Sequence, residues 1–182
     1  MVGVTNERDR SEAEWGGPMS QEVDVRDVAV VYSSPMWRLT KKNIAVATGI
    51  TADGRHGQGI GTSRWSGDTA MDEAVENLKR NVGTREFSFQ IVALEGGYAN
   101  VRIEFLDEQG VYRTTGSTRG LTANKRVEIT ASKDGRSVSA NNDESGFSLE
   151  NVGFGRRDWS DMLEGALDSA ESRLDRVGTT TV

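Results

Sequence analysis

Glycine occupies every second position from Gly57 to Gly61, and this alternation constrains the fold more than any other feature of the chain. The segment follows Asp53-Gly54, a dipeptide typical of tight β-hairpins. We therefore expect a strand over 42–51 that turns there and returns over about 55–63. Successive side chains of a strand point to opposite faces, so these glycines leave one face without side chains. Another backbone segment, a helix or a ligand is predicted to lie close against that face.

The rest of the chain alternates between strand and helix signals. Two amphipathic helices are predicted, one with an apolar stripe from Met71 to Val82 and an end at Gly83, the other over about 160–177. A second hairpin signal, Asp134-Gly135, joins the last two predicted strands, and 141–146 is predicted to be a polar loop. Because short hairpins pair antiparallel strands, we expect an α+β fold with a mainly antiparallel sheet and helices on one side. The further predicted strands cover 23–32, 87–94, 98–106, 111–116, 126–131 and 137–140.

A weak internal repeat predicts two diverged β-β-β-α units. Each Asp-Gly hairpin leads through a cluster of basic residues, Trp and Ser to an amphipathic helix. The alternative is chance similarity, because Asp-Gly hairpins are common before helices in α+β chains. We expect an N-terminal arm over 1–22 that is flexible or anchored on a partner, here through Trp15. A first unit over 23–83 and a β-rich β-α unit over 84–182 are expected to pack as one globular body.

A glycine-containing hairpin followed by a helix is similar to three known families. These are double-stranded RNA-binding domains, strand-annealing recombinases and the regulatory domain of isopropylmalate synthases. The similarity depends on the spacing of the three glycines from Gly57 to Gly61 and on the position of the helix. The first family carries basic residues at the helix start, where this chain has Asp68 and Asp72. The sequence is therefore not assigned to any of them.

The composition excludes several kinds of chemistry. The 182 residues include no Cys and a single His, His56, so a thiolate metal site, a cysteine nucleophile and a multi-histidine metal site within one chain are excluded. Lys and Arg total 22 and Asp and Glu total 28, and the net charge of -6 argues against a general nucleic-acid coat. No apolar run approaches the roughly 20 residues of a membrane-spanning helix, and the N-terminal residues are too polar for a signal peptide. We expect a cytoplasmic protein, or a virion protein if it is phage-encoded, with no metal, cofactor or membrane partner.

Three clusters that set tryptophan beside arginine are the candidate ligand contacts. An indole stacks on a nucleobase, and a guanidinium pairs with a phosphate. Two clusters precede predicted helix N-termini, where backbone N–H groups also favour anions. The structural alternative is that each tryptophan packs a helix onto the sheet while the arginine covers it. The candidate residues are Trp37, Arg38, Arg64, Trp65, Arg156, Arg157 and Trp159.

The sequence offers no catalytic constellation. Glu104 and Glu128 alternate with apolar residues and are expected to face solvent, and His56 is expected in a solvated hairpin loop. We therefore expect a non-enzymatic interaction protein of phage or bacterial origin, acting as a homo-oligomer or within a larger assembly. One alternative is a protein that binds or sequesters a nucleotide-like anion through the arginine–tryptophan clusters. A second is single-stranded nucleic-acid binding, which would add Lys41, Lys42, Lys125 and Arg126 to the contacts.

Overall fold

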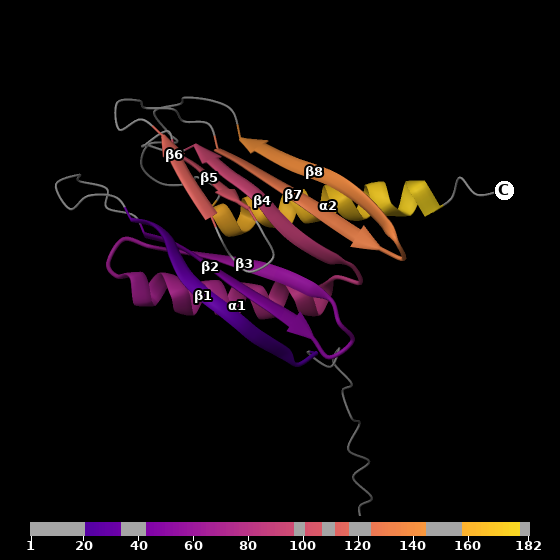
Figure 1. Cartoon of the computed structure of the whole chain (residues 1–182), viewed down its shortest axis with the longest axis horizontal. Coiled ribbons are helices and arrows are strands. Elements are labelled where there is room, and N and C mark those ends of the chain that lie inside the picture. Colours follow the sequence, from indigo (N-terminus) through magenta and orange to yellow (C-terminus); the bar gives the residue numbers. More distant parts are fainter. Residues whose placement is uncertain are drawn as a thin grey trace, which may run out of the picture.

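The computed structural model describes residues 21–33, 43–96, 101–106, 112–116, 125–144 and 158–178. Strand is the main secondary structure, and two helices accompany it (Figure 1). The predicted α+β class with antiparallel pairing is confirmed, with the strands divided between two sheets. The elements are β1 (Val23–Ser33), β2 (Asn43–Thr51), β3 (His56–Ser63), α1 (Gly67–Thr84), β4 (Ser88–Gly96), β5 (Val101–Phe105), β6 (Tyr112–Gly116), β7 (Lys125–Lys133), β8 (Arg136–Glu144) and α2 (Trp159–Gly178).

The two sheets have related connections. The first has the order β1-β2-β3 and is followed by α1, and the second has the order β6-β5-β4-β7-β8 and is followed by α2. Without the β5–β6 hairpin, the second sheet is also a three-stranded sheet, β4-β7-β8, that leads into a helix. This order is the one that two β-β-β-α units would have, and the duplication itself stays a prediction. The predicted arm falls almost entirely on residues 1–20, which lie outside the described residues.

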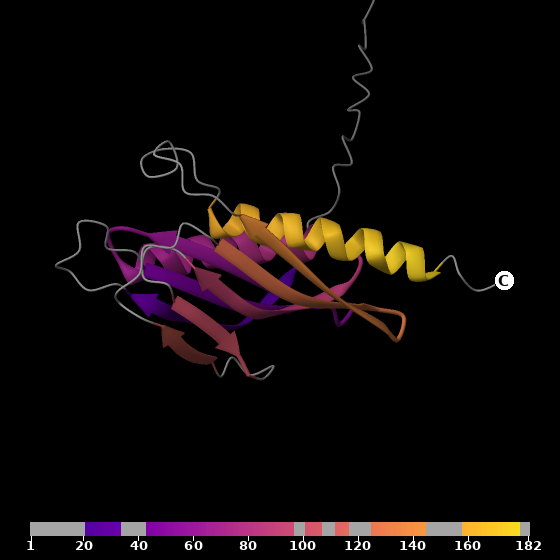
Figure 2. The same ribbon diagram turned by 90° about the horizontal axis from the view of Figure 1, so that it is seen from above.

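Both helices lie on the same side of the strands, and β5 and β6 are the strands furthest from them (Figure 2). Helix α1 covers the glycine face of β3. A Cβ added to Gly59 would come within 3.0 Å of backbone atoms of Ala74 and Leu78, and one added to Gly61 would meet Ala70 equally closely. The glycines therefore admit a helix rather than a ligand, which is one of the outcomes the alternation predicts.

Helix α2 packs on the second sheet through a different arrangement of small and polar residues. Its apolar stripe is buried in the core from Met162 to Leu174, with Leu163 and Leu167 fully buried. Here the close approach occurs at Gly165 of the helix, which faces the side-chain amide of Asn142 on β8. That amide donates a hydrogen bond to the Met162 carbonyl at 3.1 Å. The glycine is thus on the strand in the first sheet and on the helix in the second.

Two predicted boundaries are wrong. Helix α1 continues through Gly83 to Thr84, and the φ of Gly83 is not positive, so Gly83 does not terminate the helix in a left-handed conformation. The predicted polar loop over 141–146 begins too early, because β8 continues to Glu144. Residues 141–144 pair with 125–128 of β7. Polar side chains are common on an edge strand such as β8. The polar sequence of residues 141–144 alone therefore did not distinguish a strand from a loop.

Hydrogen bonds between backbone N–H groups and side chains join the two sheets, in place of the backbone–backbone hydrogen bonds of a continuous sheet. Among the described strands, β3 and β4 lie side by side but belong to different sheets. The His56 N–H donates to Ser88 Oγ at 3.2 Å, and the Ile91 N–H donates to Gln58 Oε1. These contacts advance along both strands in the same direction, so β3 and β4 run parallel. We call this junction, formed by 56–58 of β3 and 88–91 of β4, the intersheet seam.

Candidate functional site

The topology places the described members of the predicted ligand contacts, Arg64, Trp65 and Trp159, at one end of the molecule. Strands β1 and β3 end there, β2 and β7 begin there, and both helices start there. The Thr62 hydroxyl at the end of β3 donates to Asp158 Oδ1 at 3.0 Å, so a hydrogen bond links the end of β3 to the residue just before α2. Of the seven candidate ligand contacts, the structure describes Arg64, Trp65 and Trp159. Trp37, Arg38, Arg156 and Arg157, with Lys41 and Lys42, lie outside the described residues.

Trp65 and Arg64 are both exposed in the connection between β3 and α1. The Trp65 side chain is 88% exposed, the highest value among the large hydrophobic residues that the structure describes as exposed. Its backbone is held: the N–H groups of Trp65 and Ser66 donate to Ser63 Oγ at 3.1 and 3.4 Å. Ser66 Oγ accepts from the Thr69 N–H at 3.1 Å and so caps α1. A turn held by hydrogen bonds therefore presents a large apolar ring to solvent.

Trp159 has the opposite environment. It is the first residue of α2, it is only 3% exposed, and it belongs to the hydrophobic core. The ammonium of Lys125, itself buried, lies 5.3 Å from the centroid of its ring. A cation over an indole face is attracted by the ring electrons. This arrangement fits the structural role that was the alternative for the tryptophan clusters.

The N-terminus of α2 is occupied by carboxylates of the chain. Asp158 Oδ1 accepts from the Trp159 N–H at 2.8 Å, and Asp161 Oδ2 accepts from the Asp158 N–H at 3.3 Å. A negative charge at this position is favourable because of the helix dipole. An external anion would have to compete with both side chains. Binding of an anion by the predicted cluster before α2 stays a prediction.

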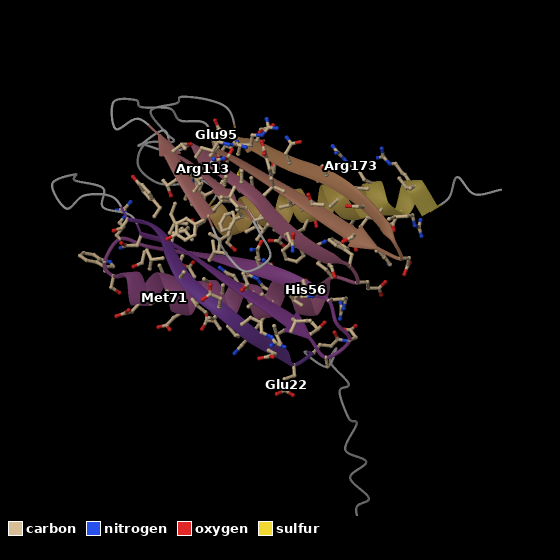
Figure 3. The ribbon with its side chains drawn as sticks, viewed as in Figure 1. Glu22, His56, Met71, Glu95, Arg113 and Arg173 are labelled. Carbon is tan, nitrogen blue, oxygen red and sulfur yellow. The ribbon has the colours of Figure 1, made fainter. Side chains whose placement is uncertain are left out.

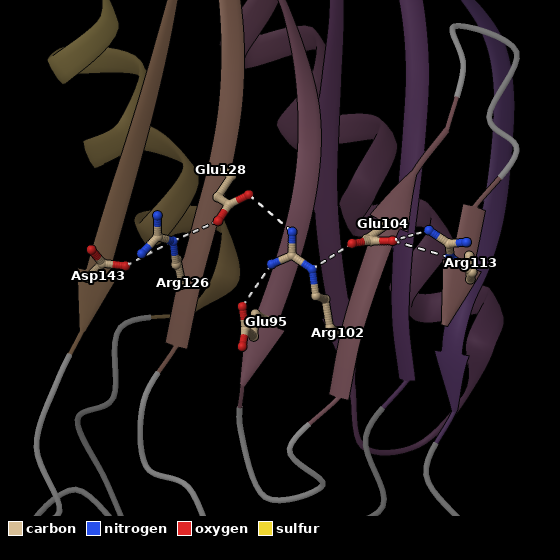
Figure 4. Close-up of polar contacts among 7 residues, drawn as sticks. All are labelled: Glu95, Arg102, Glu104, Arg113, Arg126, Glu128 and Asp143. Carbon is tan, nitrogen blue, oxygen red and sulfur yellow. Dashed lines mark hydrogen bonds and ion pairs between the residues drawn. The ribbon is translucent and has the colours of Figure 1, made fainter. Parts of the chain in front are cut away.

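Arg126 belongs to an ion-pair ladder on the open face of the second sheet, opposite α2 (Figure 4). The ladder crosses all five strands, from Asp143 on β8 to Arg113 on β6. Arg102 on β5 is its centre, because it pairs with carboxylates on β4, β5 and β7. The successive pairs are Asp143–Arg126 (3.5 Å), Arg126–Glu128 (2.8 Å), Glu128–Arg102 (3.3 Å), Arg102–Glu95 (2.8 Å), Arg102–Glu104 (2.8 Å) and Glu104–Arg113 (2.6 Å).

The ladder shifts the pKa of Glu104 and of Arg102. Hydrogen bonds from Arg102 and then from Arg113 lower the pKa of the Glu104 carboxyl below its ordinary value of 4.5. The hydrogen bond to Glu104 is the largest of the effects that raise the pKa of the Arg102 guanidinium. Both shifts favour the charged forms of Glu104 and Arg102, and acidic and basic residues alternate along the ladder. Glu104 and Glu128 lie on this open face, as their alternation with apolar residues predicted.

The sequence interpretation missed the residues at the intersheet seam. His56 is the first residue of β3 and is exposed at the junction of the two sheets (Figure 3). Gln58, two residues later on the same face, is buried. The glycine alternation contained the signal: if Gly57 and Gly59 face a helix, the residues between them face the other way. Nothing local indicated that β4 would lie beside them.

Other kinds of site receive no support from the described residues. In those ranges, no three His, Asp or Glu side chains come together as potential metal ligands. Neither described helix combines the length and the apolar character that a bilayer crossing requires.

Comparison with known proteins adds no relative. No protein-family model, curated protein or solved structure matches the chain.

Proposed function

We propose that the chain is a non-enzymatic interaction protein that acts as a homo-oligomer, or as a component of a larger assembly, through the surface formed by Arg64 and Trp65. The observation that carries this proposal is the 88% exposure of Trp65 on a turn held by Ser63. Tryptophan and arginine are enriched among the residues that contribute most to binding at protein interfaces. Burying one exposed indole removes a large apolar area from water at little entropic cost, because the turn is already ordered. A cytoplasmic or virion location and a phage or bacterial origin belong to the same proposal.

Sedimentation of the full-length chain over a range of concentrations tests the homo-oligomer. We expect a concentration-dependent oligomer, and we expect Trp65→Ala to raise its dissociation constant by at least about tenfold, the factor for 1.4 kcal/mol. Leu106→Ala is the control, because it removes another exposed large hydrophobic side chain from a different surface. A monomer at every concentration, or an equal effect of both variants, contradicts the homo-oligomer.

A nucleotide-like anion is the second candidate, favoured by the exposed guanidinium of Arg64 beside the Trp65 indole at the start of α1. Ser66 already caps this helix, and Asp68 in its first turn adds a negative charge, so the site is less suited to an anion than to a protein surface. A thermal-shift series with nucleotides measures this directly. Stabilisation that Trp65→Ala abolishes supports the anion site, and no stabilisation by any nucleotide counts against it.

Single-stranded nucleic-acid binding is the remaining proposal and uses the same end of the molecule. Of its added contacts, Lys125 is buried over Trp159, and Arg126 is paired with Glu128 and Asp143. Binding that depends on phosphate contacts weakens steeply as salt concentration rises. An affinity for an oligonucleotide that does not change with salt contradicts this reading.

A further inference from the structure

The intersheet seam opens into a groove of about 580 Å³ on the side of the first sheet away from α1. The groove is lined by residues of β1, β2 and β3 in the first sheet and of β4 and β5 in the second. Binding sites for small molecules in proteins are typically about 300–1,000 Å³. The groove is thus large enough for a small organic ligand, and it lies apart from the Arg64–Trp65 surface, at the opposite end of β3.

A bulge in β4 lies in the wall of the groove. The pairing of β4 with β7 shifts between Ile91 and Ala93, so Val92 is the extra residue. Strand β5 pairs with β4 only from Ala93 onward. Before the bulge, β4 instead receives the side chain of Gln58 on β3. The second sheet therefore diverges from the first at Val92, and the end of β5 projects beside the opening.

The polar lining of the groove carries no negative charge. The chain has a net charge of -6, yet none of the described residues lining the groove is Asp or Glu. Its ionisable members are Arg26 and His56, and Thr48 adds a hydroxyl. Arg26 has an ion pair with Asp24 at 2.9 Å, but both side chains are largely exposed, so this pair contributes little and can be exchanged for another anion.

Four apolar residues of the lining are accessible to solvent. Val92 is 40% exposed and Leu106 is 53% exposed, and Ile50 and Phe105 beside them are partly exposed. Apolar area that remains in contact with water favours a ligand that covers it. We propose that the groove is a binding site for a small amphipathic organic anion, whose apolar body covers Val92 and Leu106 while its carboxylate or sulfonate pairs with Arg26.

Two fluorescent probes test the proposal on the full-length chain. Anilinonaphthalenesulfonate is an amphipathic anion, and phenylnaphthylamine has the same hydrocarbon body without the sulfonate. We expect saturable binding of one sulfonate probe per folded chain and, because the charge contributes, weaker binding of the neutral probe by about tenfold. Binding that does not saturate, or equal affinity for the two probes, overturns the proposal.

A pair of matched variants locates the probe. Leu106→Glu adds a carboxylate to the groove at an exposed position, so we expect the chain to fold and the sulfonate affinity to fall by about tenfold. Val177→Glu makes the same change at a residue of similar exposure, 49%, near the end of α2 and is expected to leave the affinity unchanged. Equal losses in both variants overturn the assignment to the groove.

Two further variants separate this site from the proposed interaction surface. Arg26→Gln is expected to weaken the sulfonate probe and to leave the neutral probe unaffected, because it removes only the cation. Trp65→Ala is expected to change neither probe. Loss of probe binding in Trp65→Ala, or no effect of Arg26→Gln on the sulfonate, contradicts the groove site, whereas the oligomeric state of these proteins reports separately on the interaction surface.

Discussion

The side-chain carbonyl of Gln58 accepts a hydrogen bond from the backbone N–H of Ile91, in a strand of the other sheet. Both groups are buried, and a buried N–H without an acceptor is costly. The side chain of one glutamine therefore takes the place of a backbone–backbone hydrogen bond between two parallel strands. Side chains of α1 pair with backbone groups further along β3 in the same way. The side-chain amide of Asn77 donates to the Ile60 carbonyl at 2.7 Å, and Glu73 Oε2 accepts from the Thr62 N–H at 2.8 Å.

Removal of this acceptor is expected to weaken the seam. Gln58→Leu leaves the Ile91 N–H without its partner, so we expect the free energy of unfolding to fall by about 1–3 kcal/mol. Urea denaturation measures the loss, and hydrogen exchange should show faster exchange of the Ile91 amide. Gln90→Leu, a change of a half-buried glutamine on the same strand, is expected to stay within about 0.5 kcal/mol of the wild type. Equal stability of the two variants contradicts the role assigned to Gln58.

Substitution of the strand glycines tests the packing of α1. Gly59→Ala places a methyl group against backbone atoms of Ala74 and Leu78, which cannot move independently of the helix. We expect a loss of about 1–3 kcal/mol or more, measured by urea denaturation. Gly83→Ala is the control, since a Cβ there meets nothing within 4 Å and lies in a helix. It should stabilise the protein by about 0.5–1 kcal/mol. A Gly59→Ala variant with the same free energy of unfolding as the wild type would show that α1 does not lie against β3.

The ion-pair ladder predicts a dependence of stability on pH. The pKa of Glu104 is lower in the folded protein than its ordinary value of 4.5, because Arg102 and Arg113 donate hydrogen bonds to the carboxylate. The stabilisation is therefore fully present above the unfolded-state pKa and is lost as pH falls through the folded-state pKa. Urea denaturation between neutral and acidic pH should show this loss below about pH 4.5.

Arg102 is the residue whose replacement should remove most of this effect. Its side chain is 31% exposed and its guanidinium pairs with three carboxylates. Arg102→Gln is therefore expected to cost about 1–2 kcal/mol at neutral pH, more than one exposed pair but less than a buried one. The variant should also show a shallower fall in stability at acidic pH. Arg136→Gln, which breaks only the 3.9 Å pair with Asp134, should cost less than about 0.5 kcal/mol. An unchanged acid transition in Arg102→Gln contradicts the ladder.

Local signals predicted the elements of this fold better than their assembly. The Asp-Gly hairpins and the amphipathic helices depend on neighbouring residues, and each appears close to its predicted range. The intersheet seam depends on Gln58 and Ile91, which are far apart in the chain and share no periodic pattern. The candidate site shows the same limit, because Trp65 and Trp159 have similar local sequences and opposite exposures. Trp65 lies in the connection before the N-cap of α1, whereas Trp159 is the first residue of α2 and belongs to the core.

The two tryptophans should therefore respond oppositely to substitution. Trp159→Ala removes a buried ring beneath Lys125, and we expect it to lower the free energy of unfolding by about 3–5 kcal/mol. Trp65→Ala removes a ring that is 88% exposed and should change stability by less than about 0.5 kcal/mol. Urea denaturation followed by circular dichroism compares both without depending on tryptophan fluorescence.

Quenching of fluorescence by acrylamide gives an independent measure of the same difference. Quenching requires contact between acrylamide and the indole, so Trp65 contributes to the accessible fraction and Trp159 to the shielded fraction. Trp65→Phe should reduce the accessible fraction of the monomeric protein, whereas Trp159→Phe should reduce the shielded fraction. If the proposed oligomer buries Trp65, the accessible fraction of the wild type should fall as protein concentration rises. A constant accessible fraction across the oligomerisation range would place the interface elsewhere.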